Sequence, residues 1–129
     1  MIAVDSSALI AVVAEELEAA ACIAVLTGND LIISSATLAE VLIVAKRKRL
    51  EPSLRTLLDG LAMDVIEVDE SFAEAAAAAY ERWGKGFHRA DLNYGDSFSY
   101  ALAEVYDCPL LYVGNDFWQT DMRSALVGD

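Results

Sequence analysis

Short apolar runs alternate with longer segments of helical periodicity, and this alternation constrains the fold of the chain most. The runs Met1–Val4 and Leu110–Val113 are continuously apolar, as expected for strands buried on both faces. Two more strand-like segments, 31–34 and 65–68, lie between them and are flanked by amphipathic segments. Strands that alternate with helices form a parallel sheet covered on both faces. We therefore predict an α/β fold, a three-layer α/β/α sandwich with a mostly parallel sheet of four to five strands.

The spacing of apolar residues predicts the segments that connect these strands. Leu9, Ile10 and Val13 recur at helical spacing, and the alanine-rich segment before Trp83 has high helix propensity. The predicted helices span residues 7–13, 15–26, 37–49, 51–62, 71–83, 95–106 and 115–119, and a last short strand is expected at 125–127. Because 129 residues suffice for one core but not for two, residues 1–129 are expected to form a single domain.

The composition is that of a folded protein, with 56% hydrophobic and 23% charged residues. Asp5 interrupts the first apolar run, so we expect no signal peptide, and no apolar stretch reaches the roughly 18 residues of a membrane span. Cys22 and Cys108 match no metal-binding spacing and are expected to be buried thiols, with a disulfide as the less favoured alternative. These features predict a cytoplasmic protein with no membrane partner.

Four acidic residues follow the apolar segments and are the candidate functional residues. Asp5 ends the first strand, Glu40 lies in the first turn of the helix after the second strand, Asp96 opens a later helix, and Asp116 follows a Gly-Asn turn after the last long apolar run. Each has a purely structural interpretation. Asp5, Asp96 and Asp116 suit caps or turns, and Thr37 with Glu40 has the spacing of a capping box.

Taken together, the four acids indicate a metal site. The carboxyl ends of parallel strands meet at one edge of a sheet, where ligands bind in this class of fold. All four acids are expected at that edge, where their mutual repulsion would raise some of their pKa values. Mg²⁺ or Mn²⁺ would offset this repulsion, since both take carboxylate oxygens as ligands. Such an ion can activate water for attack on a phosphodiester.

The net charge of −12 argues against a nucleic-acid partner, which usually requires a basic field, but the few cations are grouped. The run Lys46–Arg49 either complements a helix dipole or contacts phosphate. Lys85, His88 and Arg89 precede Asp96 in a glycine-containing loop and are candidates for RNA contact, although His88 is more simply explained as an exposed loop residue. Three aromatic residues could stack on bases or anchor their segments: Phe87, Tyr94 and Trp118.

The acidic segments resemble those of the PIN-domain ribonucleases, and in particular the VapC-type toxins of prokaryotic toxin–antitoxin pairs. Met1–Leu9 looks like the opening strand of that family with its first acid and hydroxyl, and Ser34–Val41 is similar to the second-acid segment. Leu92–Ala103 closely resembles the third-acid segment, and Leu111–Phe117, followed by Thr120-Asp121, resembles the fourth. The resemblance covers nearly the whole chain, and the order of the segments is the same.

The resemblance implies a metal-dependent endoribonuclease that acts as a toxin. Its four metal ligands and catalytic acids would be Asp5, Glu40, Asp96 and Asp116. Ser6 would orient ligands or water, and Asp121 is a possible outer-shell acid with an equally plausible role as a solvated turn residue. The family also implies an antitoxin bound in a groove between the helices of residues 7–26 and 37–61, and a homodimer.

Two other functions remain as alternatives. The chain could be a non-catalytic PIN-like module that only binds RNA or protein, although a degenerate site usually loses some of its acids. A phosphoryl-transfer enzyme or receiver domain fits poorly. A phosphatase of the haloacid type needs a second Asp two residues after the first, where this chain has Ser7, and a receiver needs a lysine after its last strand, whereas the last lysine here is Lys85.

Overall fold

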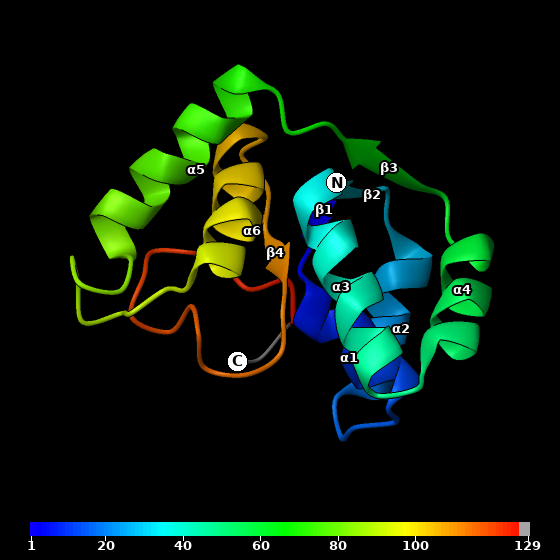
Figure 1. Cartoon of the computed structure of the whole chain (residues 1–129). Coiled ribbons are helices and arrows are strands. Elements are labelled where there is room, and N and C mark those ends of the chain that lie inside the picture. The colour runs from blue at the N-terminus through cyan, green and yellow to red at the C-terminus, as the bar shows by residue number, and fades with distance from the viewer. Residues whose placement is uncertain (127–129) are drawn as a thin grey trace.

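The structure is a computed structural model that describes residues 1–126 (Figure 1). The strands of this range are β1 (Ile2–Val4), β2 (Leu31–Ser34), β3 (Met63–Ile66) and β4 (Leu110–Leu111). The helices are α1 (Ser6–Val13), α2 (Ala19–Gly28), α3 (Ser35–Arg47), α4 (Glu51–Gly60), α5 (Glu70–Trp83) and α6 (Tyr94–Val105).

The strands form one parallel sheet in the order β3-β2-β1-β4, so the predicted α/β fold is confirmed. Successive side chains of a strand point to opposite faces, and the core is divided accordingly. Ile2 and Val4 pack with α1 to α4, whereas Ala3 packs with α5 and α6. Figure 1 shows these two groups of helices on opposite sides of the sheet, which gives the three layers.

Polar residues at the ends of β1 and β2 start the next helices without an intervening loop. Asp5 caps α1, and Ser34 caps α3 by accepting a hydrogen bond of 2.9 Å from the Thr37 amide. Asn93 and Asp96 form a capping box at the start of α6. Three helix N-termini therefore lie near the carboxyl ends of the central strands, where a site for an anion or a metal ion is favoured in folds of this class.

Most predicted boundaries differ from the structure by one or two residues, and a few elements differ in other ways. The helix expected from residue 15 begins at Ala19, because Glu15 adopts a left-handed backbone with φ of 55° and breaks the helical path. β3 lies two residues earlier than predicted. Residues 115–119 form turns after Gly114 rather than a helix. The strand predicted at 125–127 is not formed at 125 and 126, where only an isolated bridge joins Ser124 to Leu110, and residue 127 lies outside the described residues.

Both cysteines, Cys22 and Cys108, are buried and free, as the sequence predicted. Burial raises the pKa of the Cys22 thiol to about 11 and also raises that of Cys108, so both are unreactive hydrophobic residues. Within residues 1–126, no helix is both long and apolar enough to cross a membrane.

Candidate active site

Asp5 is held rigidly at the end of β1. It is only 3% exposed, and its Oδ2 accepts hydrogen bonds from the Ser7 amide at 3.1 Å and from the Ser7 hydroxyl at 2.6 Å. Its Oδ1 accepts a bond of 2.5 Å from the Ser99 hydroxyl of α6. Ser7 Oγ in turn accepts from the amide of Val113, which follows β4. The predicted cap role of Asp5 is thus real, but the cap uses only one of its two oxygens.

A buried chain of hydroxyl groups leads from the start of α3 to Asp5. Ser34 Oγ donates to Thr37 Oγ1 at 3.0 Å, and Thr37 Oγ1 lies 3.4 Å from Ser99 Oγ. A hydroxyl has one proton, and that of Ser99 goes to Asp5, so Thr37 must donate to Ser99. All three hydroxyl residues are at most 1% exposed. The chain therefore points every donor toward the Asp5 carboxylate, a cooperative arrangement that fixes and stabilises its charge.

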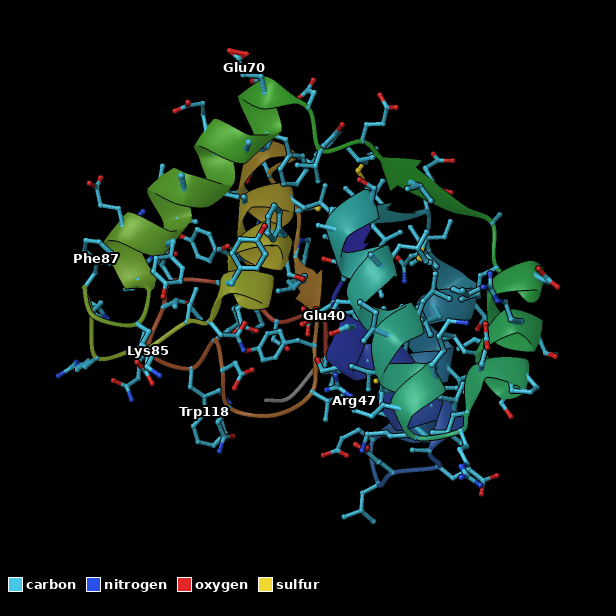
Figure 2. The ribbon with its side chains drawn as sticks, viewed as in Figure 1. Glu40, Arg47, Glu70, Lys85, Phe87 and Trp118 are labelled. Carbon is cyan, nitrogen blue, oxygen red and sulfur yellow. The ribbon has the colours of Figure 1, made fainter. Side chains whose placement is uncertain are left out.

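Glu40 projects from α3 toward the start of α6 and is half-buried (Figure 2). Its Oε1 accepts a hydrogen bond of 3.0 Å from the Ser6 hydroxyl. The capping box predicted between Thr37 and Glu40 is wrong, because Ser34 is the cap of α3 and Glu40 is engaged by Ser6 instead. A Cβ at Gly95 would overlap Glu40 Oε2, so any larger residue at this position would displace the Glu40 carboxylate.

The pKa of Glu40 is raised above its usual value, mainly by burial and further by the negative charges of Asp5 and Asp116, while the Ser6 bond acts in the opposite direction. Asp96 is 7% exposed, and burial raises its pKa to about 7. The hydrogen bond from the Asn93 amide lowers this pKa, whereas the charges of Asp116, Asp5 and Glu40 raise it further.

Asp116 lies in the exposed turn after β4, where Gly114 has φ of +100°. Its charge acts on both Glu40 and Asp96. The structure therefore brings the four predicted acids, which come from four separate segments of the chain, into one electrostatic environment at the carboxyl edge of the sheet. Four carboxylates that repel one another are unfavourable unless a cation is present.

The chemistry of this donor set fits a hard divalent cation, since carboxylate and hydroxyl oxygens are its preferred ligands. Within residues 1–126, however, no three His, Cys, Asp or Glu side chains already form a group that could hold a metal ion. Protein donors engage the carboxylates instead: Ser7 and Ser99 bind Asp5, and Ser6 binds Glu40. The raised pKa values of Glu40 and Asp96 indicate that the negative charge gathered here would be stabilised by a divalent cation.

The remaining predicted residues lie around this cluster or away from it. Ser6 contacts Glu40 as described, but Asp121 accepts hydrogen bonds from the Tyr100 hydroxyl at 2.5 Å and from Arg82 at 3.3 Å, so its partners are α6 and α5. Tyr100 and Arg82 thereby tie the C-terminal segment to these two helices. These contacts of Asp121 are structural. Its predicted role as an acid that supports the metal ligands stays a prediction.

The loop between α5 and α6 presents its cations to solvent. Lys85 and Arg89 are exposed, and neither forms an ion pair within the described part of the chain. His88 is half-buried: its Nδ1 accepts a hydrogen bond of 2.9 Å from the Ala90 amide, and its ring packs edge-on against Trp83 at 4.8 Å. His88 therefore shapes the loop, and Lys85 and Arg89 are the side chains available for an anionic ligand.

The basic run 46–49 lies at the end of α3 (Figure 2, Arg47). Lys46 pairs with Glu51 at 2.8 Å, whereas Arg47, Lys48 and Arg49 form no ion pair among residues 1–126. Lys46 and Arg47 occupy the last turn of α3, where positive charge complements the helix dipole. The structural interpretation of this run accounts for Lys46 and Arg47, whereas Lys48 and Arg49 follow the helix and have no ion-pair partner among residues 1–126.

The sequence of this chain is similar to those of known proteins. The PIN domain family model matches residues 2–122. Ribonuclease VapC30 of Mycobacterium tuberculosis is 40% identical over 96% of this chain and 98% of its own length. Ribonuclease VapC36 of the same organism is 43% identical over 93% of this chain and 90% of its own length. Ribonuclease VapC of Mycolicibacterium smegmatis is 40% identical over 95% of this chain and 98% of its own length.

Solved structures show the same fold. The Mycobacterium tuberculosis VapC20 toxin, described as cleaving the sarcin-ricin loop, has a TM-score of 0.75 at 16% identity and covers 95% of this chain and 96% of its own. A toxin–antitoxin complex from Klebsiella pneumoniae has a TM-score of 0.70 at 20% identity, covering 94% and 93%. Because the family model spans most of the chain and the relatives are about 40% identical over nearly all of it, the chain belongs to the PIN-domain family, among the VapC-type proteins.

Proposed function

We propose that this protein is a Mg²⁺- or Mn²⁺-dependent endoribonuclease that acts in the cytoplasm as the toxin of a toxin–antitoxin pair. The observation that carries the proposal is the gathering of Asp5, Glu40, Asp96 and Asp116 in one environment, where burial, and after it the charges of the neighbouring acids, raises the pKa of Glu40 and Asp96. The family and the ribonuclease relatives support RNA as the substrate. Such a cluster is difficult to explain as part of a purely structural domain, because it weakens the fold.

The side chains of the protein position the metal ion and the RNA. The four acids would hold the ion, which when bound supplies an activated water and stabilises the leaving oxygen of the phosphodiester. The hydroxyl chain that ends at Ser99 fixes one oxygen of Asp5, and Ser6 fixes one oxygen of Glu40. Lys85 and Arg89 contact the phosphates of the RNA, and His88 orders the loop that carries them.

The similar solved complexes suggest which partners this protein binds. The similar complex from Klebsiella pneumoniae pairs a toxin with its antitoxin, and a further neighbour, VapBC2 from Rickettsia felis, has a TM-score of 0.69 at 15% identity over 96% of this chain and 97% of its own. We infer that this chain also binds an antitoxin, across α1 to α4, and forms a homodimer. An antitoxin cation placed against the acids would inhibit by taking the position of the metal ion's charge.

An RNA cleavage assay tests the proposal. The purified protein is incubated with a single-stranded or structured RNA in Mg²⁺ or Mn²⁺, with EDTA as the control. Asp5→Asn should abolish cleavage, whereas Asp59→Asn, which changes an exposed acid on α4, should leave it unchanged. Absence of cleavage in both metals by the wild-type protein would refute an endoribonuclease. If calorimetry then detects metal binding without turnover, the non-catalytic module is favoured.

A further inference from the structure

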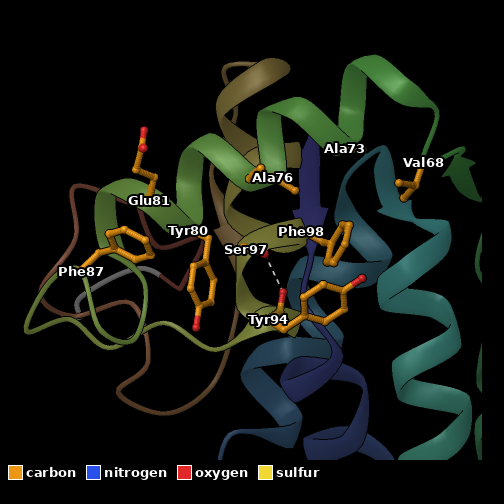
Figure 3. Close-up of a pocket in the computed structure, with 10 residues that line it drawn as sticks. Val68, Ala73, Ala76, Tyr80, Glu81, Phe87, Tyr94, Ser97 and Phe98 are labelled. Atoms are coloured by element: carbon orange, nitrogen blue, oxygen red, sulfur yellow. Dashed lines mark hydrogen bonds between the residues drawn. The ribbon is translucent and has the colours of Figure 1, made fainter.

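A groove of about 630 Å³ lies between α5 and α6, on the opposite side of α6 from the acids (Figure 3). Tyr94, Ser97 and Phe98 line it from α6, at the i, i+3 and i+4 positions that share one helix face. Asp96 lies two residues after Tyr94 and therefore on the other side of the same turn. The groove and the acid cluster are thus separated only by the first turn of α6.

The groove exists because small alanines of α5 face the rings of α6 and of the loop, with Tyr80 of α5 at one end. Ala73, Ala76 and Ala77 form its α5 wall, and their methyl groups leave the space between the helices unfilled. The rings that border the space are Tyr80, Phe87, Tyr94 and Phe98. Figure 3 shows Tyr80 and Phe87 at one end and Tyr94 and Phe98 at the other. The shape is that of a slot between aromatic side chains, and its walls are mostly apolar.

Two of these rings are exposed although they are large and apolar. Phe87 is 62% exposed and Tyr94 is 75% exposed. Phe87 packs edge-on against Tyr80 at 6.0 Å, and Tyr94 packs edge-on against Phe98 at 5.0 Å. Edge-on packing against the half-buried Tyr80 or the buried Phe98 fixes each exposed ring in position and leaves it open to a flat ligand. Exposed apolar groups gathered at a pocket are a sign of a binding surface.

Cations lie beside the groove. Lys85 and Arg89 share the loop of Phe87 and are unpaired among the described residues, so both can contact phosphate. Glu81 contributes to the rim, but its carboxylate points away from the rings (Figure 3). An aromatic slot flanked by cations suits single-stranded nucleic acid, since bases stack on rings and phosphates pair with Lys and Arg.

We propose that the groove between α5 and α6 binds an unpaired nucleobase of the RNA strand, next to the phosphodiester that the acids address. The proposal rests on the proposed function for the identity of the substrate. A helix with its side chains is about 10–12 Å across, so a strand that passes over the N-terminal end of α6 meets the acids on one side and the groove on the other. The base stacks against Tyr94 or Phe87, and Lys85 and Arg89 hold the neighbouring phosphates.

The test is the affinity for a fluorescein-labelled single-stranded oligoribonucleotide, measured by anisotropy in EDTA so that no cleavage occurs. Tyr94→Ala and Phe87→Ala should each raise Kd by about tenfold, as the loss of one base–aromatic stack does. Tyr94→Phe, which keeps the ring, should bind like the wild type. Tyr106→Ala is the matched control, because Tyr106 is also an exposed aromatic residue but follows the far end of α6. For an oligonucleotide without bases, the wild type and Tyr94→Ala should have the same Kd.

Unchanged affinity in both alanine variants overturns the groove proposal, and an equal loss in Tyr106→Ala does the same. Cleavage separates this failure from that of the proposed function. If the wild type cleaves RNA and Tyr94→Ala has the same KM, the endoribonuclease stands and the groove does not. If the wild type never cleaves but Tyr94→Ala loses RNA affinity, the groove stands alone. Should Tyr94→Ala dissociate a dimer in sedimentation and keep its affinity for RNA, the groove is an interface between two copies and the proposal is refuted.

Discussion

Replacing Asp96 with asparagine should stabilise the metal-free protein, and this stabilisation should grow as the pH rises from 4.5 to 8. Asparagine keeps the oxygen that accepts the Asn93 amide, so the capping box survives, but it cannot ionise. In the wild type, burial and the charges of the other three acids raise the Asp96 pKa from 3.8 to about 7. The folded protein thus holds this proton over a pH range in which the unfolded chain has already released it.

The sign and size of the effect follow from linkage. Between pH 3.8 and 7 the folded state binds more protons than the unfolded state, so stability falls as pH rises. One pKa unit corresponds to 1.36 kcal/mol, so ionised Asp96 weakens the fold by about 4 kcal/mol at pH 8. Near pH 4.5 the corresponding loss is only about 1 kcal/mol. The advantage of Asp96→Asn should therefore grow by about 3 kcal/mol between pH 4.5 and pH 8.

Urea unfolding in EDTA at several pH values measures this difference. Asp69→Asn is the matched control, because Asp69 is also the cap of a helix, α5, but is exposed and lies outside the acid cluster. Its variant should differ from the wild type by less than about 0.5 kcal/mol and show no growth between pH 4.5 and 8, since Asn and Asp are equivalent caps. If Asp96→Asn is no more stable than the wild type at pH 8, or is equally stabilised at every pH, burial and the neighbouring carboxylates do not raise the Asp96 pKa as described.

Three further outcomes are expected. Ser99→Ala removes the donor to the buried Asp5 Oδ1, so the free energy of unfolding in urea should fall by about 1.5–3 kcal/mol. Excess Mn²⁺ at pH 8 should raise the Tm of the wild type but not that of Asp5→Asn, and an equal rise in both would place the ion elsewhere. Gly95→Ala puts a methyl group against Glu40 and should weaken Mn²⁺ binding in calorimetry by about tenfold or more. The control Gly60→Ala, which meets open space on α4, should leave that binding unchanged.

The layers of the fold were predictable because the strands and helices that form them show a local pattern of apolar residues in the sequence. The continuous apolar run at β1 and the helical spacing in α1 are visible in any short window of the sequence. The boundary of α2 was not, because a left-handed backbone at Glu15 is rare for this residue type. The turn after Gly114 had a local signal in its Gly-Asn pair, and the apolar Phe117 and Trp118 obscured it.

The acids were predictable as a group, whereas the hydroxyl chain was not. Strand polarity alone places Asp5 and Asp116 at the same edge of a parallel sheet. The bond between Ser99 and Asp5 joins residues 94 positions apart, and the contact of Thr37 with Ser99 spans 62 positions. Both depend on how α6 packs over β1 and α3, which no periodicity specifies. The one available signal was Ser99 itself, a polar residue on the same helix face as Asp96 and within an apolar stretch.

The capping and functional interpretations of these acids prove to be compatible. Asp5 caps α1 through Oδ2 while Oδ1 receives the Ser99 hydroxyl, and Asp96 closes its capping box through Oδ2. A cap fixes a carboxylate at the first turn of a helix, and in a parallel sheet those first turns lie at the carboxyl edge of the strands. Capping is therefore the means by which this fold places Asp5 and Asp96 at that edge. The capping bond at Asp96 does not outweigh burial and the neighbouring charges, since the pKa of Asp96 remains raised, and a bound cation would offset the destabilisation that is left.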